Sequence, residues 1–212
     1  MEEWEYRRPK KTDDAFKSRT QDWWNNATID SKDLYKSGEG NWNIYAEGYK
    51  RAGDWLFERV NQGRADQDFV VYPIVFLYRH AIELKLKWII EIGGRLIDEP
   101  RDLRISHDLI ALWKECREIL EKVWSEGSSD TLDTAEKIIN QFSKEDPESM
   151  TFRYPVDTDG NFLIPDSKLI NLENLKDVVE GIYNLLNGSS TGISEYLDGK
   201  YESEYHRQQE QF

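Results

Sequence analysis

The sequence predicts an all-α protein, a helical bundle of about five to six helices with a short hairpin-like insertion. Apolar side chains recur every three or four residues along most of the chain, which is the spacing of one face of an α-helix. A chain of 212 residues can also bury one sizeable core. We therefore expect an N-terminal arm at 1–38, a principal helical domain at 39–188 and a C-terminal helical tail at 189–212.

The N-terminal elements follow from the spacing of their apolar residues. The first 38 residues are polar and aperiodic, so they predict an arm with at most a short helix at 13–24. A clear amphipathic pattern predicts a helix over 41–61, and a second helix is expected over 69–92. Gly93-Gly94 is expected to end the second helix, because glycine is typical of helix ends.

Three further helices and the insertion complete the prediction. Ser106 is a good N-cap for a third helix, and a shorter fourth helix is expected over 130–142. Asn171 can cap a fifth helix, which Gly188 is expected to stop; the tail beyond it is compatible with helix. Between the fourth and fifth helices, the run "MTFRYPVDTDGNFLIP" has two strand-like pieces around a turn signal, which favours a small hairpin or ordered loop.

Composition limits the classes of function. The formal net charge is −13, which opposes generic duplex DNA binding and would favour a basic partner protein. The longest uncharged apolar run, 69–78, is far shorter than the roughly 20 residues of a membrane span, so we expect no membrane insertion and a cytoplasmic location. The single cysteine, Cys116, excludes an intramolecular disulfide and is expected in the core. No motif for a metal ion or cofactor occurs; Asp157 to Asn161 is typical of a plain turn.

The second predicted helix carries an island of polar residues within an apolar pattern. Arg79, His80, Glu83 and Lys87 fall within about a third of the helix circumference. Charges placed there are costly to bury unless they are paired. Two interpretations follow: the charges satisfy one another in a groove between helices, or they line a pocket for a phosphate or another anionic group.

Three short segments resemble a group of bacterial proteins. They are "YRHAIELKLK", "SHDLIALW" and "FRYP", in this order within about residues 65–187. The group resembles the HEPN-like helical proteins of prokaryotic defence and toxin–antitoxin systems. The resemblance implies a metal-independent endoribonuclease, usually dimeric, in which a 2′-hydroxyl attacks the adjacent phosphate while a histidine transfers protons and an arginine stabilises charge. Its signature is an arginine and a histidine four to six residues apart, which Arg101 and His107 match.

The sequence thus yields two hypotheses and one set of candidate residues. The first hypothesis is an HEPN-like RNase with RNA or a nucleotide as ligand and a homodimer or cognate protein as partner. The second is a non-catalytic helical module that binds a partner protein or nucleotide. Two of the candidates also have a purely structural interpretation. His107 could be a surface or capping-region residue, and Arg153 could be a structural clamp on Glu83. The catalytic candidates are His107, Arg101 and His80; the phosphate- or ligand-binding candidates are Arg79, Glu83, Lys87 and Arg153.

Overall fold

The computed structural model describes residues 41–101, 106–125, 127 and 129–209. Within these residues the chain forms five helices and no strand, so the all-α prediction is confirmed. The N-terminal arm and the short helix predicted at 13–24 lie outside the described residues. No helix in the described part is long and apolar enough to cross a membrane.

The first two helices follow the predicted pattern closely. Helix α2 spans Asn41–Asn61, and helix α3 spans Gln67–Leu96 with Asp66 as its N-cap. The prediction that Gly93-Gly94 ends the second helix is wrong by one turn. Gly93 makes room for Ile119 of a neighbouring helix, and Gly94 makes room for the chain at Glu99 and Arg101. In α3, every residue from Ala81 to Ile90 is buried, as expected for a helix surrounded by others.

Helix α4 spans Leu109–Val123 and buries the face predicted for it, including Cys116. Its N-cap is Asp108 rather than Ser106, because the Asp108 carboxylate accepts hydrogen bonds from the N–H groups of Ile110 and Ala111. His107 therefore lies just before the helix and not in its first turn. The carboxylate of Asp108 also occupies helix N–H groups that could otherwise bind an anion.

Helix α5 spans Ser129–Glu145, and helix α6 spans Leu172–Gln209, where the side chain of Asn171 accepts from the N–H of Asn174 as predicted. The prediction that Gly188 stops this helix is wrong. Ser190, Ile193 and Leu197 are buried at helical spacing beyond it, and this burial outweighs the cost of about 1 kcal/mol for a glycine inside a helix. Within the described residues, the tail predicted from 189 onward is therefore the second half of α6, which ends at Gln209.

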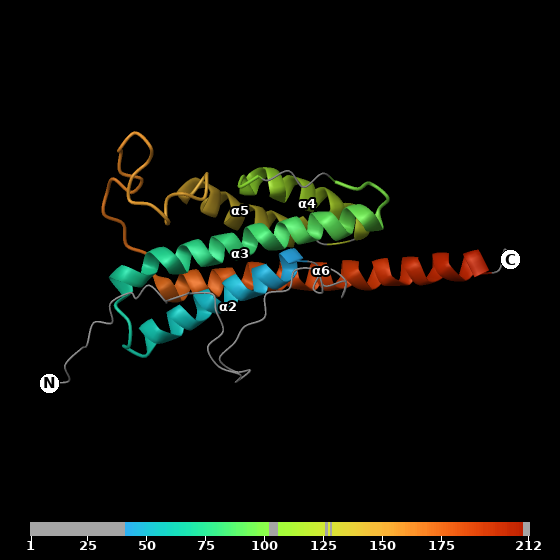
Figure 1. The fold of residues 1–212 in the computed structure, drawn as a ribbon, viewed down its shortest axis with the longest axis horizontal. Coiled ribbons are helices and arrows are strands. Elements are labelled where there is room, and N and C mark those ends of the chain that lie inside the picture. Colours follow the sequence, from blue (N-terminus) through green and yellow to red (C-terminus); the bar gives the residue numbers. More distant parts are fainter. Residues whose placement is uncertain (1–40, 102–105, 126, 128, 210–212) are drawn as a thin grey trace, which may run out of the picture.

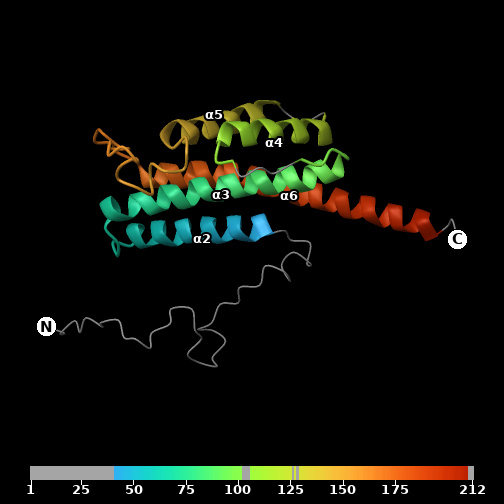
Figure 2. The ribbon, with the colours of Figure 1, turned by 45° about the horizontal axis from the view of Figure 1, so that its top comes forward.

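Helix α3 is the centre of the bundle (Figure 1). Helix α2 packs on one side of it and α4 on the opposite side, with α5 beside α4, and α6 lies against α3 along the bundle (Figure 2). The C-terminal part of α6 extends past the other helices in both views. Between α5 and α6, the hairpin-like insertion contains a single antiparallel bridge, from Val156 to Phe162, and no strand.

Candidate functional site

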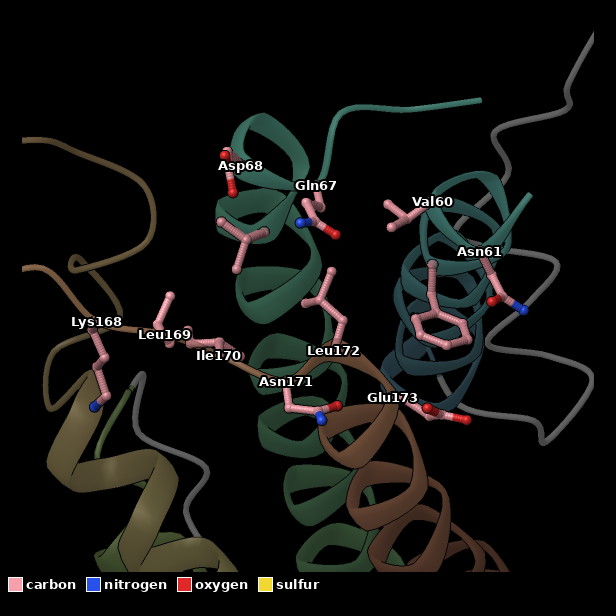
Figure 3. A pocket seen from close by; sticks show the side chains of 12 residues that line it. Val60, Asn61, Gln67, Asp68, Lys168, Leu169, Ile170, Asn171, Leu172 and Glu173 are labelled. Atoms are coloured by element: carbon pink, nitrogen blue, oxygen red, sulfur yellow. The ribbon is translucent and has the colours of Figure 1, made fainter. Parts of the chain in front are cut away.

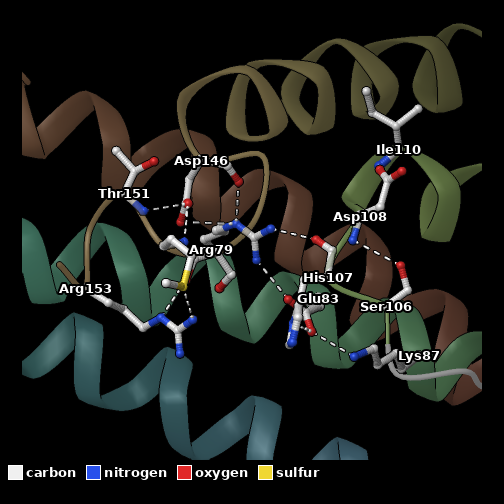
Figure 4. A network of polar contacts seen from close by, with 12 residues as sticks. Arg79, Glu83, Lys87, Ser106, His107, Asp108, Ile110, Asp146, Thr151 and Arg153 are labelled. Atoms are coloured by element: carbon white, nitrogen blue, oxygen red, sulfur yellow. Dashed lines mark hydrogen bonds and ion pairs between the residues drawn. The ribbon is translucent and has the colours of Figure 1, made fainter. Parts of the chain in front are cut away.

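The polar island of α3 is buried. Arg79 and Glu83 have no exposed surface, and Lys87 is 3% exposed. All three lie on the side of α3 that faces the chain just before α4 and just after α5 (Figure 4). Charges that are buried away from water must be paired. The partners of these three residues therefore decide between a self-paired network and a ligand pocket.

Glu83 is the centre of the network. One of its oxygens accepts from Arg79 Nη1 at 2.8 Å, and the other accepts from Lys87 Nζ at 2.8 Å and lies 3.0 Å from His107 Nδ1. Burial alone would raise the pKa of Glu83, but the bonds and charges of Lys87 and Arg79 outweigh it and hold the pKa below its ordinary value. Glu83 is therefore an ionised carboxylate in the folded protein.

Arg79 ties α3 to two loops (Figure 4). Its Nη2 donates to the backbone oxygen of His107 at 2.7 Å, and its Nε donates to the backbone oxygen of Asp146 at 3.1 Å. The Asp146 carboxylate lies 3.4 Å from the same Nε and also accepts from the N–H groups of Met150 and Thr151. One guanidinium thus fixes the start of α4 and the loop after α5 onto α3.

The network is balanced in charge. Two cations, Arg79 and Lys87, face two carboxylates, Glu83 and Asp146. Lys87 is further covered by the ring of Trp42, whose centroid lies 5.4 Å from Nζ. The structure thus gives a carboxylate partner to Arg79 and Lys87, two of the three cations predicted to bind phosphate, as the paired-charge interpretation requires.

His107 connects this buried network to the surface. Its side chain is 47% exposed, although its Nδ1 reaches the fully buried Glu83. An ionised carboxylate can only accept, so in the neutral ring Nδ1 carries the proton and Nε2 keeps its lone pair. Because the two ring nitrogens lie on opposite edges, Nε2 faces away from Glu83. Glu83 therefore fixes both the orientation and the tautomer of His107.

His80 is half-buried between two aromatic rings. The ring of Phe76 stacks on it with centroids 5.5 Å apart, and that of Tyr49 meets it edge-on at 4.5 Å. Burial lowers the pKa of His80, and the charges of Lys87, Arg79 and His107 add to that effect against the opposing charge of Glu83. His80 is therefore a neutral group at pH 7.

Arg153 also lies near Phe76. Its guanidinium carbon is 5.6 Å from the centroid of the Phe76 ring and 5.4 Å from that of Tyr154. Its hydrogen bonds within the described residues run from Nε to the backbone oxygen of Ser149 and from Nη2 to the sulfur of Met150. The structure does not show the predicted clamp of Arg153 on Glu83.

Arg101 is separated from His107. It pairs with Glu99 at 3.1 Å and lies 3.7 Å from Glu118, and its backbone packs beside Gly94. Gly94 is eleven residues along α3 from Glu83, which at 1.5 Å per residue is roughly 16 Å. The structure therefore does not bring together the two residues that matched the arginine–histidine signature.

Sequence reasoning missed two participants. Asp146 lies after the end of α5 in a turn-forming run, where no periodic pattern distinguishes a buried acid from an exposed one. Lys85, also on α3, is fully buried and donates to the amide oxygens of Asn43 and Asn187. Burial lowers the pKa of Lys85 to about 8. Its amide partners come from α2 and α6, and no periodic pattern within α3 encodes them.

A separate cavity of about 370 Å³ lies at the end of the bundle (Figure 3). Val60 and Asn61 from α2, Asp68 from α3 and the segment 168–173 before and into α6 line it. None of the predicted site residues contributes to it. Its charged lining residues are of both signs, so it offers no concentrated field to a charged ligand.

The three sequence segments that suggested a common site thus meet around α3. Arg79, Glu83 and Lys87 come from the first, His107 from the second, and Arg153 from the third, and Phe76 lies near both Arg153 and His80. In the described part of the chain, no group of three or more potential metal-ligating side chains occurs. No family model matches this chain, and comparisons with the curated proteins and with the solved structures also give no match.

Proposed function

We propose that this chain is an HEPN-like protein of prokaryotic defence or toxin–antitoxin type that cleaves RNA in the cytoplasm without a metal ion. The observation that supports it is the pair formed by Glu83 and His107. A fully buried carboxylate holds a histidine that is 47% exposed. This is the arrangement in which a carboxylate orients an imidazole and stabilises its protonated form during acid–base catalysis.

The chemistry assigned to His107 is a proton transfer in each direction. Nε2 takes the proton of a ribose 2′-hydroxyl, and the 2′-oxygen forms a bond to the adjacent phosphorus as the bond from phosphorus to the 5′-oxygen breaks. The resulting imidazolium, stabilised by Glu83, returns the proton to the leaving 5′-oxygen. The products are a 2′,3′-cyclic phosphate and a 5′-hydroxyl end. No step uses redox chemistry or an added co-reactant.

Arg153 is the cation available to the phosphate. Arg79 and Lys87 already have carboxylate partners, whereas no described carboxylate lies within ion-pair distance of Arg153. His107 and Arg153 lie on either side of Arg79 in Figure 4. In this proposal Arg79, Glu83, Lys87 and Asp146 position His107 and do not touch the substrate.

The test is RNA cleavage in the presence of a metal chelator, followed for the parent, His107→Ala and His206→Ala. His206 is a matched control because it is an exposed histidine on α6, remote in sequence from the network. We expect His107→Ala to lower kcat by about 100-fold or more and His206→Ala to leave it unchanged. Absence of cleavage by the parent, or cleavage that His107→Ala leaves intact, contradicts the proposal.

A second candidate function is supported by the charge balance of the network. Because Arg79 and Lys87 are already paired with carboxylates, the buried island can serve stability alone. The chain would then be a non-catalytic helical module that binds a nucleotide or a partner protein. The same assay separates the two: this candidate predicts no cleavage by any variant, whereas binding of RNA or nucleotide by the parent would persist in His107→Ala.

A further inference from the structure

A cavity of about 390 Å³ lies beside Arg153, between α3 and the insertion that follows α5. Tyr72 of α3 forms one wall, and Tyr154 and Phe162 of the insertion form another. Only one lining residue carries a charge, and that residue is Arg153. The cavity therefore combines aromatic surface with a single positive charge.

Three of the four aromatic residues that line this cavity are exposed to an unusual degree, whereas Phe152 is buried. Tyr72 is 48% exposed, Tyr154 is 49% exposed and Phe162 is 72% exposed. Exposed aromatic surface that converges on one hollow is typical of a binding site, because it gains free energy only when a ligand covers it. The flat faces of nucleobases are the partners that such side chains stack on in single-stranded RNA.

The insertion holds the aromatic wall in place. The bridge between Val156 and Phe162 closes a turn in which the Asp157 carboxylate accepts from the N–H groups of Asp159 and Asn161. Gly160 occupies the left-handed region, with φ of 85°, which glycine adopts without strain. Phe162 is thus presented on an ordered turn, so less conformational entropy is lost when a ligand binds.

Arg153 is also held before any ligand arrives. The backbone oxygen of Ser149 accepts from its Nε, and the rings of Phe76 and Tyr154 lie near its guanidinium carbon. Ser149 is buried and has a φ of 61°, in the left-handed region. Packing therefore holds the backbone of this loop, and with it the oxygen that accepts from Arg153, in one conformation. An exposed guanidinium fixed in this way suits one phosphate, which it can contact through the nitrogens left to solvent.

The cavity is linked to the His107 network through two side chains of α3, Phe76 and His80. The Phe76 ring lies beneath the Arg153 guanidinium at 5.6 Å and stacks on His80 at 5.5 Å. His80 in turn lies beside the Glu83 network to which His107 is bonded. These contacts connect Arg153 of the cavity with the network that orients His107.

We propose that the cavity lined by Tyr72, Arg153, Tyr154 and Phe162 is a nucleobase subsite for single-stranded RNA. An unpaired base next to the cleaved bond stacks on Tyr154 and Phe162, and Arg153 binds the phosphate attached to it. This inference rests on the proposed function, since it takes RNA as the ligand. It adds the substrate class: an unpaired strand, because a base within a duplex cannot enter the cavity.

The experiment measures binding of a short fluorescent single-stranded oligoribonucleotide to full-length His107→Ala protein, which leaves the RNA uncut. Tyr154→Ala, Phe162→Ala and Arg153→Gln are added to this background one at a time. Tyr201→Ala is the matched control, because Tyr201 is also 49% exposed but lies on α6 far along the chain. The same oligonucleotide is compared with its duplex and with an abasic strand of equal length. Cleavage by the corresponding variants with His107 intact is followed in parallel.

We expect Tyr154→Ala and Phe162→Ala to raise Kd by about 5- to 100-fold, the range for loss of one stacked base. Tyr201→Ala leaves Kd unchanged, and the duplex and the abasic strand bind as weakly as the cavity variants bind the intact strand. Arg153→Gln weakens binding and lowers the slope of log Kd against log salt by about one. With His107 present, Tyr154→Ala and Phe162→Ala raise KM more than they lower kcat.

The outcomes separate this inference from the proposed function. If the parent cleaves RNA but the cavity variants bind and cleave like Tyr201→Ala, the subsite is wrong and the nuclease stands. If RNA binds through the cavity but the parent does not cleave it, the subsite stands and the nuclease is wrong. If the protein does not bind single-stranded RNA, both are overturned.

Discussion

The Nδ1 atom of His107 lies 3.0 Å from Oε1 of Glu83, a carboxylate with no exposed surface. The same carboxylate also accepts from Arg79 and Lys87. A surface histidine is therefore part of the interior charge balance of the protein. We expect substitutions of Glu83, the buried partner, to affect stability, and substitutions of His107, the exposed partner, to affect the proposed chemistry.

The first prediction concerns Glu83→Gln, which preserves shape but removes a negative charge. Arg79 keeps Asp146, whereas Lys87 is left buried without a carboxylate, so we expect the free energy of unfolding to fall by about 3–5 kcal/mol. Urea unfolding monitored by tryptophan fluorescence measures it. Glu121→Gln, which breaks an exposed pair with Arg117, is the control and should cost about 1 kcal/mol or less. Equal losses for both variants would mean that the buried network does not stabilise the fold.

The second prediction concerns the protonation of His80. Burial and neighbouring cations lower its pKa, so His80 should titrate below the ordinary value of about 6.5, whereas in the unfolded chain it titrates near that value. The unfolded state then binds more protons near pH 6, and the contribution of His80 to stability falls as pH falls through that range. NMR titration of the imidazole carbons measures the pKa, with His80→Gln to assign the signal. A pKa for His80 above 6.5 would contradict the structure.

The third prediction concerns Lys85, whose pKa burial lowers to about 8 from its ordinary 10.5. Between these values the unfolded chain binds more protons than the folded one, so Lys85 adds a positive slope to the free energy of unfolding as pH rises above 8, of at most about 1.4 kcal/mol per pH unit. Comparison of the parent with Lys85→Met between pH 8 and 9.5 isolates this slope. The range stops there because buried Tyr78 and Tyr183, whose pKa values burial raises, add an opposite slope near pH 10. Parallel curves for the two proteins would show that Lys85 has an ordinary pKa.

The fourth prediction uses one substitution at two glycines. Gly188 lies inside α6, and a methyl group added to it would have no neighbouring side chain within 4 Å, so Gly188→Ala should stabilise the protein by up to about 1 kcal/mol. A methyl group on Gly53 would lie 2.6 Å from the buried ring of Tyr78, so Gly53→Ala should destabilise it. Thermal unfolding of both variants gives the signs. A loss of stability in Gly188→Ala would contradict a continuous α6.

The helices could be predicted from the sequence because each has a long apolar face. The pattern over 41–61 matched α2 residue for residue, and the apolar face that contains Cys116 matched the buried side of α4. Errors fell at the ends of elements, where local signals compete with packing. Gly188 resembles a helix stop, but burial of Ile193 and Leu197 overrides it. Ser106 resembles a cap, but Asp108 binds the helix N–H groups.

The candidate site was predictable only in part, because local spacing is visible in the sequence and packing between helices is not. The residues Arg79, Glu83 and Lys87 share a face because they lie four apart on one helix, which the sequence shows directly. The pairing of Arg79 with Asp146 depends on how α5 and the loop after it pack on α3, and no periodicity encodes that. The spacing of Arg101 and His107 is a purely local match, and packing beside Gly94 holds Arg101 elsewhere.

The contacts of Arg79 also bear on how fast the protein loses its structure. This side chain joins α3 to His107, 28 positions away, and to Asp146, 67 positions away. We therefore expect these bonds to close late in folding, when the start of α4 and the loop after α5 have docked on α3. Interactions that form after the main folding barrier slow unfolding more than they speed folding. The lifetime of the native state, and with it resistance to proteases when cleavage outpaces refolding, therefore depends on a residue that no protease or solvent molecule reaches.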